Sequence, residues 1–184
     1  MERVIVIGTS CSGKTTFADN LAAKLNCGRI ELDALNWLPD WQERSHEEFR
    51  ALAREAVVAE QWVMDGNYTR LRDITWSRAT TLIWLNYPLS TVIRQWFQRT
   101  WQRAYHKEEL FGGNSETFRR AFFSRDSLLI WILKTYHSVR ARYRIIFDEN
   151  QYEALEKIEF RHPRQAQAFL DTLPIAPAPN RDAA

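Results

Sequence analysis

The chain has 184 residues, of which 45% are apolar, so it is long enough to bury a hydrophobic core as one domain, and this composition excludes a disordered or fibrous protein. The formal net charge of +2 argues against a strongly basic nucleic-acid-binding protein. Two cysteines cannot form a disulfide framework, and no apolar run is long enough to span a bilayer. We therefore expect a single cytoplasmic domain over residues 1–173.

Short apolar runs alternate with helical patterns along the chain. The β-branched run Val4–Ile7 ends at Gly8 and is typical of a buried parallel strand. We expect further strands at residues 29–33, 61–65, 80–85 and 157–160. Helices are expected at about 14–25, 46–60, 88–105 and 163–173, and a long one from about 115. The alternation predicts an α/β fold with a doubly wound, five-stranded parallel sheet, followed by a disordered tail at 174–184.

The strongest motif directly follows the first predicted strand and reads G-x4-G-K-T from Gly8 to Thr15. Its glycines let the backbone wrap around phosphate, while inward N–H groups and the dipole of the next helix attract the anion. In this motif the lysine binds the β- and γ-phosphates, and the threonine hydroxyl binds Mg²⁺. A merely tight strand–helix turn would need the glycines but not Lys-Thr. The sequence therefore predicts a P-loop for ATP and Mg²⁺, with contacts from Gly8, Ser10, Cys11, Ser12, Gly13, Lys14, Thr15 and Thr16.

Two aspartates follow predicted strands. Asp65 ends the hydrophobic strand before Gly66, where its carboxylate could hold Mg²⁺ through the water shell of the ion, together with Thr15. Asp33 comes at the carboxyl end of the second strand, the edge where open α/β sheets bind ligands. The alternatives are a turn aspartate for Asp65 and a helix cap for Asp33.

Aromatic and basic residues are the next candidates. Trp37 and Trp41 could wall an acceptor pocket by stacking on a flat substrate, or they could be ordinary cover for a helix. Residues 94–144 hold eleven Lys and Arg against four acids, a local charge of +7. Within that segment, Phe97, Trp101 and Tyr105 share a helix face that we expect to pack in the core, while Arg99, Arg103 and Trp96 lie on nearly the opposite face.

Four segments together resemble the adenylate-kinase-like P-loop kinases, most closely the FlaR-type DNA topology modulation proteins. They are residues 8–16, the sequence Glu-Leu-Asp-Ala-Leu-Asn-Trp-Leu-Pro-Asp-Trp at 31–41, Asp-Gly-Asn-Tyr at 65–68, and the arginine-rich helix after Pro88. The resemblance implies a P-loop kinase fold with a short helical lid at about 94–125.

The same resemblance implies roles for individual residues. An acid at the position of Asp33 faces the acceptor hydroxyl, where it could orient or deprotonate the nucleophile. Arg94 packs on the adenine, and Arg99 or Arg103 contacts the transferring phosphates when the lid closes. Arg70 is the counterpart of an acceptor-binding arginine, although it stands one position later than in adenylate kinases.

These observations predict an ATP-dependent phosphotransferase, similar to nucleoside and nucleotide kinases, that acts on a small acceptor which the residues do not identify. The alternative is a nucleotide-regulated DNA-binding protein that modulates DNA topology. Its support is the +7 segment, where a phosphate-binding lid also needs arginines.

Overall fold

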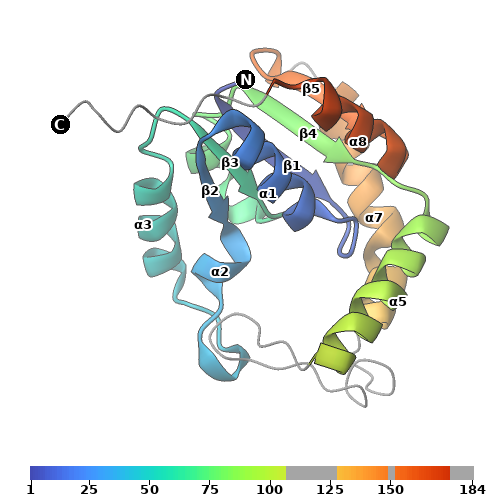
Figure 1. Ribbon diagram of the computed structural model, residues 1–184. Helices are drawn as coiled ribbons and strands as arrows, with labels where there is room; N and C mark the ends of the chain where they lie inside the picture. Colours follow the sequence, from blue (N-terminus) through green and yellow to red (C-terminus); the bar gives the residue numbers. More distant parts are fainter. Residues whose placement is uncertain (107–127, 149–151, 175–184) are drawn as a thin grey trace.

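The computed structural model describes residues 1–106, 128–148 and 152–174. Its centre is a five-stranded sheet in which all neighbouring strands are parallel, in the order β2-β3-β1-β4-β5 (Figure 1). The predicted doubly wound α/β fold is confirmed. The strands are β1 (Arg3–Gly8), β2 (Gly28–Glu31), β3 (Trp62–Asp65), β4 (Thr81–Leu85) and β5 (Glu156–Phe160).

Helices cover both faces of this sheet (Figure 1). The longer ones are α1 (Lys14–Leu25), α3 (His46–Ala56), α5 (Leu89–His106), α7 (Leu128–Asp148) and α8 (Pro163–Thr172). Shorter turns of helix are α2 (Leu32–Asn36), η1 (Pro39–Trp41), η2 (Thr69–Leu71) and α4 (Arg72–Thr75). No helix in the described ranges is long and apolar enough to cross a membrane.

Alternate residues of the central strand enter two separate cores. Val4 and Val6 pack in a cluster with side chains of α1, α5 and α8, whereas Ile5 and Ile7 pack in a second cluster with side chains of α3 and α4. Helix α7 contributes to both clusters. Because β1 is buried on both faces, it needs the continuous β-branched run that its sequence supplies.

Two predicted boundaries were wrong. The second strand ends at Glu31 rather than at residue 33, because the chain turns at once into α2 and Asp33 lies in the first turn of that helix. Helix α3 begins after its Ser45 cap, as the capping box predicts, but it ends at Ala56 instead of residue 60. Three predicted features lie outside the described residues. They are the start of the long helix near residue 115, most of the lid, and the tail at residues 175–184.

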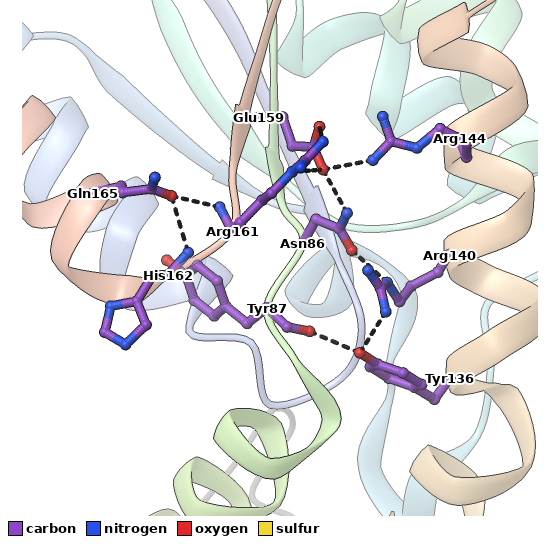
Figure 2. A network of polar contacts seen from close by, with 9 residues as sticks. All are labelled: Asn86, Tyr87, Tyr136, Arg140, Arg144, Glu159, Arg161, His162 and Gln165. Carbon is purple, nitrogen blue, oxygen red and sulfur yellow. Dashed lines mark hydrogen bonds and ion pairs between the residues drawn. The ribbon is translucent and has the colours of Figure 1, made fainter.

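A polar network joins α7 to the carboxyl ends of β4 and β5 (Figure 2). The Asn86 amide donates to Glu159 Oε1 at 2.5 Å and accepts from Arg140 Nε at 2.5 Å. Arg140 also donates to the Tyr136 hydroxyl at 2.9 Å, and that hydroxyl donates to the Tyr87 carbonyl at 3.0 Å. These bonds hold α7 beside the point where β4 leads into α5.

Glu159 receives further hydrogen bonds in the same network, from Arg144 at 2.6 Å and from Arg161 at 3.2 Å (Figure 2). Although partial burial disfavours its charged form, the hydrogen bonds from Arg144, Arg161 and Asn86 lower the pKa of Glu159 to about 2. Its ionised form therefore stabilises the fold.

This lowered pKa predicts how stability depends on pH. The contribution of Glu159 is complete above its ordinary pKa of 4.5 and is lost as pH falls toward about 2, because only the folded state keeps the group ionised in that window. Glu159→Gln should therefore be less stable than the parent chain at pH 6, and the two should converge near pH 2. Urea unfolding at several pH values measures this difference. Glu153→Gln, at an exposed position, is the control; a pH-independent deficit in Glu159→Gln would contradict the assignment.

Candidate active site

The loop between β1 and α1 has the backbone shape of a phosphate-binding loop. Cys11 and Gly13 have left-handed φ angles of 62° and 81°, and the Ser12 N–H donates to the Thr9 carbonyl at 3.1 Å. A side chain on Gly8 would clash, since its Cβ would lie 2.6 Å from Ser12 Oγ and 2.8 Å from the Leu85 carbonyl oxygen. The loop ends where the 12-residue helix α1 begins, so it lies at the positive end of the helix dipole.

Lys14 lies across this loop. Its Nζ donates to the Thr9 carbonyl oxygen at 3.0 Å, so the ammonium group lies over the loop backbone. Burial lowers the pKa of Lys14, while the carboxylates of Asp33 and Asp65 act in the opposite direction. A half-buried cation at the N-terminus of α1 makes this a site for an anion.

Asp65 is buried, 3% exposed, at the end of β3. Its Oδ2 accepts a hydrogen bond from the Thr15 hydroxyl at 2.9 Å, so the two residues predicted to hold Mg²⁺ are in direct contact. Burial raises the pKa of Asp65, and the Thr15 hydrogen bond and the Arg29 charge oppose that rise. In the described part of the chain, no three His, Cys, Asp or Glu side chains gather to hold a metal. Mg²⁺ at this place would need phosphate oxygens as additional ligands.

Arg29 is a site residue that the sequence analysis missed. From β2, its guanidinium contacts Asp65 Oδ1 at 3.0 Å, Glu31 at 2.9 Å and Asp19 at 2.5 Å. It neutralises part of the acidic charge around Asp65 and holds that carboxylate toward Thr15. A lone arginine in a strand carries no sequence signal for such a role.

Asn67 is a second missed residue. Its side-chain amide donates to the Gly8 carbonyl at 2.6 Å, and its Oδ1 accepts from the Gly8 N–H at 3.3 Å. This pair of bonds fixes the first residue of the loop to the segment after β3. A signal was present, because Asn67 belongs to the Asp-Gly-Asn-Tyr segment at 65–68 that carries part of the family resemblance.

Asp33 lies on the cavity side of α2 and is not the N-cap, a position that Glu31 occupies without a side-chain hydrogen bond. The Tyr68 hydroxyl donates to Asp33 Oδ1 at 2.6 Å and so orients that carboxylate. Arg70, predicted to contact the acceptor, instead donates to Asn36 Oδ1 at 2.6 Å and contacts Glu43 at 3.1 Å. It is not among the residues that line the cavity.

A cavity of about 1030 Å³ opens in front of the loop. Its lining includes the predicted residues Ser10, Cys11, Gly13, Lys14, Thr15, Thr16, Asp33, Trp37, Trp41, Asp65 and Arg99. It also includes residues that were not predicted as site residues: Glu31, Gln95, Phe97, Gln98, Trp101, Gln102 and Leu128. The structure thus brings the P-loop, both aspartates and both tryptophans to one place.

The aromatic face of α5 was predicted incorrectly. Trp96 is buried, together with Val92 and Thr100, whereas Phe97 and Trp101 are 50% and 58% exposed and line the cavity. Helix α5 packs on the core through every fourth residue from Val92, namely Val92, Trp96 and Thr100. The adjacent face of the helix, with Phe97 and Trp101, therefore points away from the core.

The predicted arginines of α5 are placed differently from one another. Arg99 is half-buried and lines the cavity, as a phosphate-contacting residue requires. Arg94 is exposed and does not line it. The side chain of Arg103 lies outside the described part of the structure, although its backbone belongs to α5.

Gly8 and Gly28 provide a matched test of the loop geometry. Gly8→Ala should destabilise the fold by about 1–3 kcal/mol and weaken ATP binding at least tenfold, because the new methyl group must displace Ser12 or the Leu85 backbone. Gly28→Ala places its methyl in open space and should change neither property. Urea unfolding and calorimetric titration with ATP measure both effects. Equal behaviour of the two variants would rule out the close packing at Gly8.

Comparisons with known proteins agree with the fold. The family model AAA_33, described as an AAA domain, matches residues 4–119, which is more than half of the chain. No curated protein sequence matches it. The finer resemblance to FlaR-type proteins is therefore not confirmed.

Solved structures with a similar fold include a sugar kinase and two shikimate kinases. A sugar kinase from Janibacter sp. HTCC2649 is 20% identical with a TM-score of 0.50, and the match covers 98% of this chain and 99% of that one. Shikimate kinase from Bacteroides thetaiotaomicron is 15% identical with a TM-score of 0.54 over 94% and 96% of the two chains. Shikimate kinase from Acinetobacter baumannii, in complex with shikimate, is 16% identical with a TM-score of 0.52 over 93% of this chain and 92% of that one. At these identities the likeness establishes the fold alone, a P-loop kinase-like fold.

Proposed function

Because the chain belongs to the AAA_33 family, we propose that it is an ATP-dependent phosphotransferase that moves the γ-phosphate of ATP to the hydroxyl group of a small molecule. The observation that carries this proposal is the contact between Thr15 and Asp65 at 2.9 Å, beside Lys14 on the wall of one cavity. A loop that only bound anions would not need this hydroxyl–carboxylate pair. The pair supplies hard oxygen ligands, which suit Mg²⁺.

The P-loop, Thr15 and Asp65 bind different parts of ATP·Mg²⁺. The loop N–H groups and Lys14 bind the β- and γ-phosphates, for which Lys14 exchanges its bond to the Thr9 carbonyl for bonds to phosphate oxygens. Thr15 and Asp65 would hold Mg²⁺, which neutralises charge on the phosphates when it is bound. Arg29 keeps the Asp65 carboxylate oriented toward Thr15.

Asp33 acts on the acceptor. Its carboxylate, oriented by the Tyr68 hydroxyl, accepts the proton of the acceptor hydroxyl. That oxygen forms its bond to the γ-phosphorus while the bond to the bridging oxygen breaks, so ADP leaves with the bridging oxygen. Trp37 and Trp41 hold the rest of the acceptor from the same side of the cavity.

The arginines of α5 contribute around the phosphates. Arg99, on the cavity wall, stabilises the charge on the transferred phosphoryl group, and Arg103, four positions on, joins it when the lid closes. Arg94 packs on the adenine. Arg70 acts indirectly, through its contacts with Asn36 and Glu43, which flank the segment that carries Trp37 and Trp41. The comparisons give the DNA-binding alternative no support, and we do not carry it forward.

Replacement of the loop lysine tests the phosphotransferase directly. In a screen of ATP·Mg²⁺ with nucleosides, nucleoside monophosphates and small alcohols, the protein should release ADP faster in the presence of its acceptor. Lys14→Ala should lower this acceptor-stimulated rate on the order of 10²-fold or more, because the charge on the phosphates loses its main protein cation. Lys24→Ala, in the last turn of α1, is the control and should keep the full rate. Normal turnover in Lys14→Ala would exclude the mechanism.

A further inference from the structure

The cavity also points to the chemical class of the acceptor. We propose that the acceptor is a hydroxyl compound that is neutral or cationic and carries a flat ring, bound between the Trp37–Trp41 pair and the Phe97–Trp101 pair. This inference rests on the proposed function for the reaction, but its argument uses only the walls of the cavity. It excludes acceptors whose recognised group is a carboxylate or a phosphate.

The charge of the side chains that line the cavity disfavours an anionic acceptor. Five ionisable side chains with a full charge line the described part of the cavity. Three are acids (Glu31, Asp33 and Asp65), and the two cations, Lys14 and Arg99, are assigned to the phosphates of ATP. An anionic acceptor placed against Asp33 would meet a carboxylate without a cation assigned to it, which disfavours binding.

The arginines near the cavity already form hydrogen bonds or ion pairs with protein groups. Arg29 contacts three carboxylates. Arg44 donates from Nε to the Leu35 carbonyl at 3.0 Å, and Arg70 donates to Asn36 and contacts Glu43. The guanidinium of Arg70 also lies over the rings of Phe49 and Tyr68, at 5.0 and 5.6 Å from their centroids. These contacts compensate the charge of Arg70 before any acceptor arrives, and Arg70 itself does not line the cavity.

Two pairs of aromatic rings line the cavity. Trp37 and Trp41 come from the α2–η1 side and meet edge to face, with ring centroids 5.7 Å apart. Phe97 and Trp101 come from α5 and stack nearly parallel, at 6.2 Å and 23°. Helices α2 and α5 lie on opposite sides of the loop after β1 (Figure 1). The two pairs therefore present aromatic surface from two sides of one cavity, which suits a planar ring.

The backbone near Trp41 supports the same assignment. Asp40 and Trp41 both have left-handed φ angles, 58° and 56°, which are costly for residues with side chains. The short turn is closed by hydrogen bonds from the Leu38 N–H to the Gln42 carbonyl at 2.8 Å and from the Arg44 N–H to the Asn36 carbonyl at 2.9 Å. A turn held in this conformation keeps the Trp41 indole on the cavity wall. Ordinary cover for a helix would not require two such residues in a row.

The test compares three sets of probes with the full chain. The flat-ring alcohols are uridine, adenosine and pyridoxine; the anionic set is their monophosphates and shikimate; the set without an aromatic ring is glycerol and inositol. Binding is measured by calorimetric titration without nucleotide, and phosphorylation by ADP release with ATP·Mg²⁺. We expect at least one flat-ring alcohol to bind at least tenfold more tightly than its monophosphate and more tightly than both ringless alcohols.

Variants connect the preference to the proposed wall. For the best flat-ring probe, Trp37→Ala should weaken binding at least tenfold, while Trp37→Phe should restore most of it, because a phenyl ring still stacks. Trp131→Ala is the matched control, since this tryptophan is 59% exposed on α7 and does not line the cavity. It should bind the probe as the parent chain does. Circular dichroism of each variant separates loss of stacking from loss of fold.

The two readouts separate this inference from the proposed function. Tight binding of a flat-ring alcohol without its phosphorylation would support the acceptor-site chemistry and count against the phosphotransferase. Phosphorylation in which a monophosphate, shikimate or a ringless alcohol is the best substrate would support the phosphotransferase and overturn the inference. Failure of every flat-ring alcohol to bind, or equal binding by Trp37→Ala and the parent chain, would also overturn it.

Discussion

The pairing of β1 with β3 is the constraint on which the whole site depends. In this register Val6 is the partner of Asp65, so the carboxyl end of β3 lies beside the loop that starts two residues later, at Gly8. Asp65 then reaches Thr15, and Asn67 reaches the backbone of Gly8. A shift of one residue in this pairing would turn Asp65 to the opposite face of the sheet. The close packing of Gly8 on Leu85 adds β4 to the same arrangement.

Pairing of opposite charges is the second organising feature of the site. Lys14 lies near Asp33 and Asp65, and Arg29 joins Asp65 to Glu31. Removal of one partner from such a set leaves an uncompensated buried charge, which typically costs about 3–5 kcal/mol. The groups that we propose to bind phosphate and metal are therefore oriented in advance. This is the arrangement that electrostatic stabilisation of a phosphoryl transfer needs.

The sequence predicted the sheet, the loop and most of the cavity lining, because each had a local signature. The β-branched run of β1, the G-x4-G-K-T motif and the strand that ends at Asp65 depend on residues next to one another. What it could not predict depends on contacts between distant segments. Arg29 and Tyr68 acquire their roles from the neighbours that the sheet brings to them, and the buried face of α5 was misread because helical spacing alone does not say which stripe meets the core. The lid beyond residue 106 and the roles proposed for Arg94 and Arg103 stay predictions.

The proposed mechanism depends most on Mg²⁺ being held by Thr15 and Asp65 against the phosphates of ATP. Calorimetric titration of ATP with and without Mg²⁺, for the parent chain and for Asp65→Asn, tests it most directly, with Asp171→Asn on α8 as the control. Mg²⁺ should strengthen ATP binding to the parent chain and to the control, whereas Asp65→Asn should lose most of this gain and retain metal-free binding. An equal loss of ATP affinity with and without Mg²⁺ would contradict a metal-binding role for Asp65, because this residue would then act only by supporting the fold of the loop.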